Sequence, residues 1–399
     1  MKLQNKKEIN GMIILFMMTY FVSYITRINY STIISEMVNS TGLSKALLST
    51  ALTGSAITYG TGQVISGFCG DKLQPKKLIL IGLLVISSMN ILIPLCTNVA
   101  QMAVVWSING FAQAFIWPPM VKLQVELFSD EDYNRSSVLV SWGASFGMIA
   151  MYLLSPVLIM FFGWKSVFVF SAVSGAVMAF IWNKKCHNIQ ISKQEKVHGG
   201  GTLKHILTPL MIAVMIAIVL QGALRDGVTT WMPSYISETY KTSSIISILT
   251  GVVMPVFSIL CLNLASNVYT RIRRQPVLGG GIFFGVGAAA ALLLSIFTDK
   301  NIGMSVFLSA VLTGCMHGVN FMLICMIPPY FKKYGNVSSV AGILNACTYI
   351  GSSISTYGIA VISEEAGWNT TIITWLAIAA AGTLLCFLFV PAWNRFTKK

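Results

Sequence analysis

The chain has 399 residues, of which 55% are hydrophobic and only 10% are charged, and its mean hydropathy is +0.73. These values exclude a soluble globular domain and indicate a membrane protein. The net charge of +14 does not require a nucleic-acid partner, because the basic residues follow the distribution of a membrane protein.

Apolar stretches of about 20 residues, each long enough to cross a bilayer, recur along the chain. In the first half we expect spans at 11–33, 46–68, 78–97, 101–123, 137–161 and 165–183. After a polar stretch from Asn183 to His205, a second set follows at 206–231, 243–264, 276–297, 303–328, 337–361 and 368–390. The sequence therefore predicts an all-α membrane protein with 12 transmembrane helices in two pseudo-symmetric halves of six. The predicted division is 1–183, a cytoplasmic linker at 184–205, and 206–399.

Twenty-one of the 27 lysines and arginines lie at the termini and in alternate connections between the spans. Because basic residues collect on the cytoplasmic side, we expect both termini in the cytoplasm of a multi-pass protein of the cell membrane. The eight cysteines form no CxxC pair, so we expect no metal site. The sequence contains no phosphate-binding loop of nucleotide enzymes and no convincing nucleophile–base set. It therefore predicts neither catalysis nor a cofactor.

Two arginines lie deep inside apolar spans. Arg27 shares one face of the first helix with Tyr20 and Tyr24, because these positions fall within about 60° of one another. Arg225 lies at a similar depth in the seventh span. Taken alone, Arg27 could equally extend to the outer surface of the membrane. One buried arginine in each half instead favours a shared anion site, because the guanidinium fork fits phosphate and carboxylate oxygens.

The connection after the second span carries charges at a fixed spacing. It runs Gly67-Phe-Cys-Gly-Asp71-Lys72-Leu-Gln-Pro-Lys76-Lys77, and a degraded copy in the second half runs Asn267-Val-Tyr-Thr-Arg271-Ile-Arg273-Arg274. The first stretch resembles the signature of the major facilitator superfamily, with Gln74 at its second glycine. A carboxylate beside cations at a helix end can latch helices together, so Asp71, Lys72 and Arg271 are predicted gating residues. The alternative is a basic loop kept inside by the charge rule.

Further segments carry a closer resemblance. They are Arg27-x-Asn29, Asn109-Gly110-Phe-Ala-Gln113-Ala-Phe-Ile-Trp117-Pro118-Pro119, Trp231-x-Pro233-x-Tyr235 after the seventh helix, and Tyr349-Ile-Gly351. They are similar to the organophosphate:phosphate antiporters, which carry glycerol phosphate and hexose phosphate. The resemblance implies that Arg27 and Arg225 bind the substrate phosphate. It also implies a lining of tyrosines, which could otherwise be ordinary packing residues: Tyr20, Tyr24, Tyr59 and Tyr349.

The chain departs from this family at the site itself. Gln63 stands where the family has a lysine, and His317 where it has a tyrosine. Asp226 follows Arg225 where the glycerol-phosphate type has a tyrosine. If Asp226 faces the cavity, it weakens the attraction for a dianion; it can equally pair with a neighbouring helix. His317 is either a protonatable ligand or coupling group, or a hydrogen-bonded substitute for the tyrosine. Two polar pairs at i, i+4 spacing extend the lining: Tyr59 with Gln63, and Asn345 with Tyr349.

We therefore predict a transporter of small organic anions that exchanges a sugar or glycerol phosphate for inorganic phosphate by alternating access. Two bare arginines would resist the closing of an empty cavity of low dielectric constant, which favours exchange. One alternative is a proton-coupled carrier of a carboxylate or another organic anion, with Asp226 or His317 as the coupling group. Another is a transporter-like sensor of sugar phosphate. The expected partners are the small anion and the lipid bilayer, without nucleic acid, and the expected form is a monomer.

Overall fold

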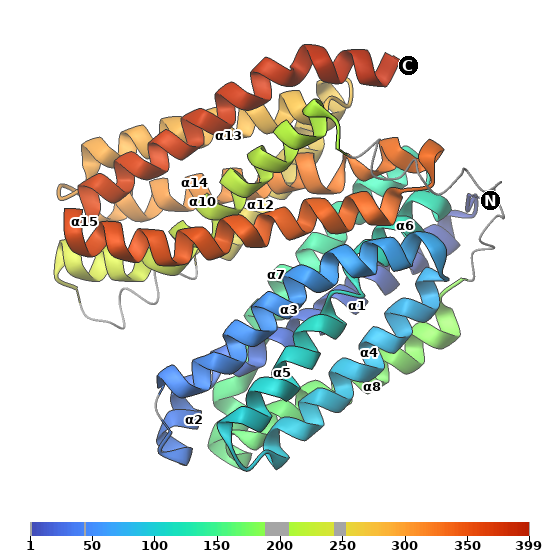
Figure 1. The fold of residues 1–399 in the computed structure, drawn as a ribbon, viewed down its shortest axis with the longest axis vertical. Coiled ribbons are helices and arrows are strands. Elements are labelled where there is room, and N and C mark those ends of the chain that lie inside the picture. The colour runs from blue at the N-terminus through green and yellow to red at the C-terminus, as the bar shows by residue number, and fades with distance from the viewer. Residues whose placement is uncertain (1, 44, 188–206, 243–252, 399) are drawn as a thin grey trace. The chain divides into compact units, whose positions relative to one another are not determined.

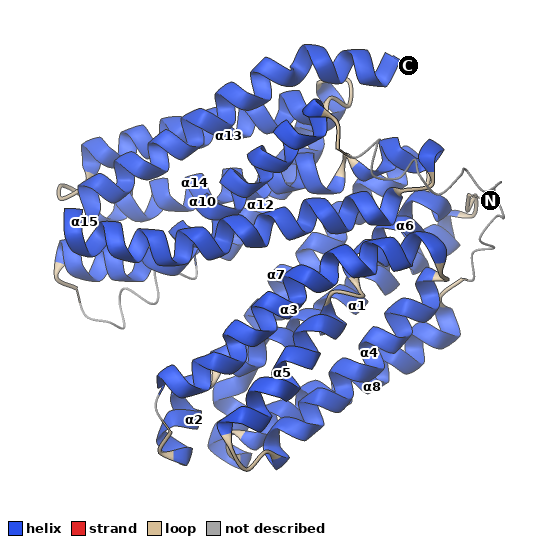
Figure 2. Cartoon of the chain, viewed as in Figure 1, coloured by secondary structure: helices blue, strands red, loops and turns tan. Residues whose placement is uncertain are grey.

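The structure is a computed structural model that describes residues 2–43, 45–187, 207–242 and 253–398. Within these residues the chain forms helices joined by short connections, and no strand is present (Figure 2). Several helices begin where the sequence supplies a capping side chain, which accepts a hydrogen bond from a backbone N–H of the first turn. The capping residues are Asn5, Asn98, Ser129, Thr208 and Asn301.

The described helices follow the predicted order of spans (Figure 1). The first half contains α1 (Lys6–Thr32), α2 (Ile34–Thr41), α3 (Lys45–Lys72), α4 (Pro75–Leu92), the 3₁₀ turn η1 (Ile93–Leu95), α5 (Val99–Gln113), α6 (Trp117–Leu127), α7 (Asp130–Phe162) and α8 (Lys165–Lys185). The second half contains α10 (Pro209–Tyr240), α12 (Val253–Arg271), α13 (Pro276–Phe297), α14 (Ile302–Asn320), the π-helical turn η2 (Phe321–Cys325), the 3₁₀ helix η3 (Pro328–Tyr334) and α15 (Val337–Lys398).

Ten helical stretches among the described residues are long and apolar enough to cross a membrane. One of them, Val337–Thr397, is 61 residues long and contains two spans, because α15 bends at Gly367, where φ is 78°. The less apolar α3, with 28 residues, completes the 12 predicted spans. Residues 243–252 of the eighth predicted span and residues 188–205 of the predicted linker lie outside the described residues.

The chain divides into two compact units. The first comprises the described part of Met1–Val197 together with Phe331–Ile343, and the second the described part of His198–Tyr330 together with Leu344–Lys399. In the first unit α1 packs on α7 and α8, α3 on α5, and α4 on α8. In the second unit α14 packs on α10, α12 and α13. The division at 184–205 inferred from composition stays a prediction.

Two helical spans change their path near prolines. The fourth predicted span is divided into α5 and α6, and α6 begins at Trp117 with proline in its first turn. After α14 the chain passes through η2 and then η3, which begins at Pro328. In the seventh span the helix is instead longer than predicted. The segment from Trp231 to Tyr235, expected after that span, lies inside α10, which continues past Pro233.

A buried polar network holds α1 in the first unit. The Asn29 amide donates to Asn90 Oδ1 of α4 at 2.7 Å and to Ser171 Oγ of α8 at 3.0 Å. The Gln113 amide of α5 donates to Thr26 Oγ1 of α1 at 3.0 Å. All five side chains are buried, and satisfied networks of this kind favour one packing arrangement. The network therefore fixes the rotation of α1 on both sides of Arg27.

Candidate substrate-binding site

Arg27 ends a row of aromatic side chains in the first unit. Its guanidinium carbon lies 4.0 Å from the ring centre of Tyr59 on α3 and 5.7 Å from that of Tyr24. The rings of Tyr24 and Tyr20 are 5.3 Å apart, and Tyr20 is 5.3 Å from Trp117 on α6. A ring face attracts a cation electrostatically, so the Tyr59 ring orients the guanidinium of Arg27. The structure thus brings together four predicted residues and adds Trp117.

Trp117, the first residue of the Trp-Pro-Pro segment, is an additional candidate that was not predicted as a binding residue from the sequence. Its indole Nε1 is buried and has no hydrogen-bond partner among the described residues. Gln63, one turn after Tyr59 on α3, is fully buried, and neither its amide nitrogen nor its amide oxygen has a partner there. Buried polar groups without partners are rare and costly, so these atoms are candidates for contact with a bound polar molecule.

In the second unit, Arg225 and Asp226 on α10 form an ion pair with each other. Arg225 Nε donates to Asp226 Oδ1 at 2.7 Å, and Nη2 donates to Oδ2 at 2.9 Å. The two side chains are 17% and 27% exposed. The Ser352 hydroxyl of α15 also bonds to the Asp226 carboxylate, and His317 of α14 interacts with both charges. The structure pairs Asp226 with the adjacent arginine of its own helix, an arrangement not predicted above, and also with Ser352 of the neighbouring helix α15.

The remaining predicted lining residues, Asn345 and Tyr349, lie on the turns of α15 that precede Ser352. Asn345 is buried and Tyr349 is half-buried. The backbones of α10 and α15 meet here, because a Cβ on Gly351 would overlap the carbonyl oxygen of Val219. This close approach brings α15 to the helix that carries Arg225.

The carboxylate of Asp71, on α3, caps the start of α15. It accepts hydrogen bonds from the backbone N–H groups of Ser338 at 2.9 Å and Ser339 at 2.7 Å. These groups belong to the first turn of the helix, where the helix dipole favours a negative charge. The nearby cation is Lys122 of α6, whose Nζ lies 3.9 Å from Asp71 Oδ1. The predicted gating residues Lys72 and Arg271 lie exposed at the ends of α3 and α12.

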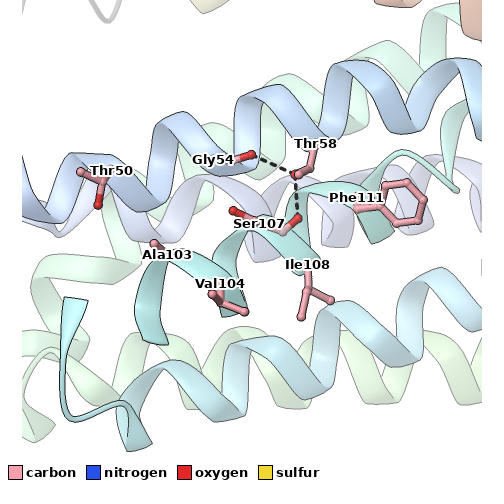
Figure 3. A pocket seen from close by; sticks show the side chains of 8 residues that line it. All are labelled: Thr50, Gly54, Thr58, Ala103, Val104, Ser107, Ile108 and Phe111. Carbon is pink, nitrogen blue, oxygen red and sulfur yellow. Dashed lines mark hydrogen bonds between the residues drawn. The ribbon is translucent and has the colours of Figure 1, made fainter. Parts of the chain in front are cut away.

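A groove of about 470 Å³ lies between α3 and α5 in the first unit (Figure 3). Its lining comprises Thr50, Gly54, Thr58, Ala103, Val104, Ser107, Ile108 and Phe111. The Thr58 hydroxyl bonds to the carbonyl oxygens of Ser107 at 2.6 Å and Gly54 at 3.0 Å, as Figure 3 shows. The lining has no charged side chain and none of the predicted binding residues, so this groove does not have the chemistry of an anion site.

Apolar helices of spanning length, with charged side chains inside them, are typical of a multi-pass membrane protein with a polar site between its helices. The model of the Major Facilitator Superfamily matches residues 16–331, and the chain belongs to that family.

Several relatives cover most of the chain. A "Probable hexose phosphate transport protein" of Chlamydia trachomatis is 21% identical over 94% of this chain and 89% of its own length. The "Membrane sensor protein UhpC" of Escherichia coli is 21% identical over 95% of this chain and 91% of its own. They agree with the resemblance to the organophosphate:phosphate antiporters.

Among solved structures, the E. coli fucose:proton symporter FucP is similar with a TM-score of 0.75 and 13% identity, over 96% of this chain and 98% of its own. A likeness at this identity concerns the fold alone. Together with the family match, it confirms the predicted all-α major facilitator fold.

Proposed function

We propose that this protein carries a phosphorylated organic anion, such as a sugar or glycerol phosphate, in exchange for inorganic phosphate. The family defines a transporter, and the similarity to a hexose phosphate transport protein supports a phosphate ester as the substrate. The observation that carries the proposal is Arg27 inside a membrane span, with its guanidinium carbon 4.0 Å from the centre of the Tyr59 ring and 5.7 Å from that of Tyr24. A guanidinium in this setting binds phosphate oxygens with two parallel hydrogen bonds.

In this proposal Arg27 and Arg225 bind the phosphate, and the other predicted residues hold the organic part. Tyrosine hydroxyls suit a polyol, because each offers one polar group on an apolar ring. The proposed lining comprises Tyr20, Tyr24, Tyr59, Gln63, His317, Asn345 and Tyr349. The unpaired amide of Gln63 supports its inclusion, since a polar ligand would satisfy it.

Transport in this proposal follows alternating access between the halves 1–183 and 206–399. Asp71 acts as a latch by capping the start of α15, and it must release the N–H groups of Ser338 and Ser339 when that helix moves. The exposed Lys72 and Arg271 serve as further gating residues. We also propose a monomer in the cell membrane, and the charge distribution supports placing both termini in the cytoplasm.

The test is exchange in proteoliposomes loaded with labelled inorganic phosphate. Glycerol phosphate or hexose phosphate added outside should release the label, while a dicarboxylate should not. Arg27→Lys and Arg225→Lys should each abolish this release, because lysine lacks the planar fork. The matched control is Arg395→Lys, since Arg395 is exposed near the C-terminus and should tolerate the change. Acid-dependent uptake of a carboxylate, with no phosphate release by any ester, would overturn the proposal.

A further inference from the structure

The ion pair between Arg225 and Asp226 uses the Nε and Nη2 donors of the guanidinium, one of the two edges through which arginine binds a planar anion. Both residues lie on α10, and two hydrogen bonds of 2.7 and 2.9 Å join the guanidinium edge to both carboxylate oxygens. A phosphate or carboxylate group binds arginine through the same planar arrangement. An anion that binds through this edge therefore competes with Asp226 for Arg225.

Asp226 has few ionisable neighbours. Among the described residues, its charged and titratable neighbours are Arg225 on its own helix and His317 on α14, while α15 contributes the Ser352 hydroxyl. The pair is mostly covered, with 17% of the Arg225 side chain and 27% of the Asp226 side chain exposed. The contact between α10 and α15 holds Ser352 in place, since the Ser355 hydroxyl donates to the Ala223 carbonyl at 2.7 Å.

A carboxylate displaced from Arg225 would be left covered and without a cation, which is strongly unfavourable. Protonation removes that charge. We propose that an anion binding to Arg225 displaces Asp226 and that Asp226 takes up one proton from water in the same step. This inference rests on the proposed function, because it takes Arg225 as part of the anion site.

The step balances in charge and in atoms. The starting state is the Arg225–Asp226 ion pair, with a free anion and a free proton. The final state is the anion paired with Arg225 and a neutral carboxylic acid at Asp226, and nothing is oxidised or reduced. His317 is not the acceptor in this scheme, because a protonated imidazole would place a second positive charge beside Arg225.

Asp226 consequently serves as an internal counterion when the site is empty. Arg225 is then neutralised with or without substrate, so it does not prevent the empty carrier from reorienting. The expectation of obligate exchange, which assumed two bare arginines, loses its basis at Arg225. Each anion bound at Arg225 brings a proton with it. A proton gradient then drives accumulation where the empty carrier reorients, whereas in exchange the protons carried in the two directions cancel.

The experiment is calorimetric titration of the purified protein with inorganic phosphate, glycerol phosphate or a dicarboxylate, in two buffers that differ in ionisation enthalpy. The difference between the buffers gives the number of protons taken up per anion. The wild type should take up about one proton more than Asp226→Asn with the same ligand, and this comparison removes the ligand's own titration. As the pH rises, the apparent affinity for the anion should also fall more steeply in the wild type than in the variant, by up to about a further tenfold per pH unit.

Three further variants sharpen the test. Asp226→Glu keeps a carboxylate and should keep the extra proton, which separates the linkage from a folding defect. Glu365→Gln removes an exposed carboxylate of α15 and should behave as the wild type. Equal proton counts in the wild type and Asp226→Asn would overturn the proposal. So would a proton count that falls by one in His317→Asn but stays at the wild-type value in Asp226→Asn.

The outcomes separate this inference from the function on which it rests. If the protein exchanges phosphate but takes up no extra proton on binding, only the inference about Asp226 is refuted. Binding of the dicarboxylate but of no phosphate ester sinks the exchange function, while the proton count measured with that ligand still decides the role of Asp226.

Discussion

The contact between Asp71 and the start of α15 allows a quantitative prediction. Asp71→Asn keeps one carbonyl acceptor and replaces the other oxygen by an amino group, which cannot accept from Ser338 or Ser339. Loss of one hydrogen bond to a charged acceptor costs about 1.5–3 kcal/mol. Loss of the charge at the helix N-terminus adds about 0.3–1 kcal/mol. The contact should therefore weaken by about 2–4 kcal/mol, which corresponds to roughly 30- to 700-fold in the equilibrium between capped and released helix.

Chemical labelling measures this equilibrium. Ser339 is buried, so a cysteine introduced there reacts with a water-soluble maleimide when the start of α15 is released. The labelling rate of Ser339→Cys should rise in the Asp71→Asn background by the factor given above, after subtraction of the signal of the native cysteines. Asp299→Asn is the matched control, because Asp299 is an exposed acid at a left-handed position that asparagine tolerates. A rise of less than about threefold would show that the two N–H contacts contribute little to the latch.

Three further substitutions test the contact between Tyr59 and Arg27, the close approach of α10 and α15, and the buried polar network of α1. Tyr59→Leu should weaken phosphate exchange, with an apparent KM two- to thirtyfold higher, because a cation–π contact contributes about 0.5–2 kcal/mol; Tyr59→Phe keeps the ring, and equal losses in both variants would contradict this reasoning. Gly351→Ala should lower stability in thermal unfolding by about 1–3 kcal/mol, since its Cβ meets the Val219 carbonyl oxygen, whereas Gly358→Ala meets no atom within 4 Å and should not. Asn90→Ala should cost about 1–3 kcal/mol by leaving Asn29 underbonded; an unchanged melting temperature would show that the network is dispensable.

Hydropathy and helical periodicity predict much of this molecule. The spans follow from runs of apolar residues, and the turn at Gly367 follows from a glycine between two such runs. The shared face of Tyr20, Tyr24 and Arg27 follows from the angle between residues along a helix. These features are local, so each is encoded in a single stretch of sequence.

Contacts between helices were harder to predict. Nothing in the sequence around Tyr59 indicates that its ring covers Arg27, 32 positions earlier in the chain. The sequence predicts Lys72 as a cation beside Asp71. In the structure the lysine nitrogen 3.9 Å from Asp71 Oδ1 belongs to Lys122, because α6 packs on α3. The pairing of Arg225 with Asp226 is local, yet periodicity misses it: adjacent Cα–Cβ bonds point about 100° apart, and only the bending of two flexible side chains brings the charges together.

The two arginines occupy similar depths in their halves but differ in their electrostatic surroundings. Arg27 faces the Tyr59 ring, which orients the guanidinium. Arg225 is compensated by the carboxylate next to it, so an anion at a distance experiences the pair as a dipole. Under the proposal made above for Asp226, the step that displaces this carboxylate from Arg225 is the one that depends on the proton concentration.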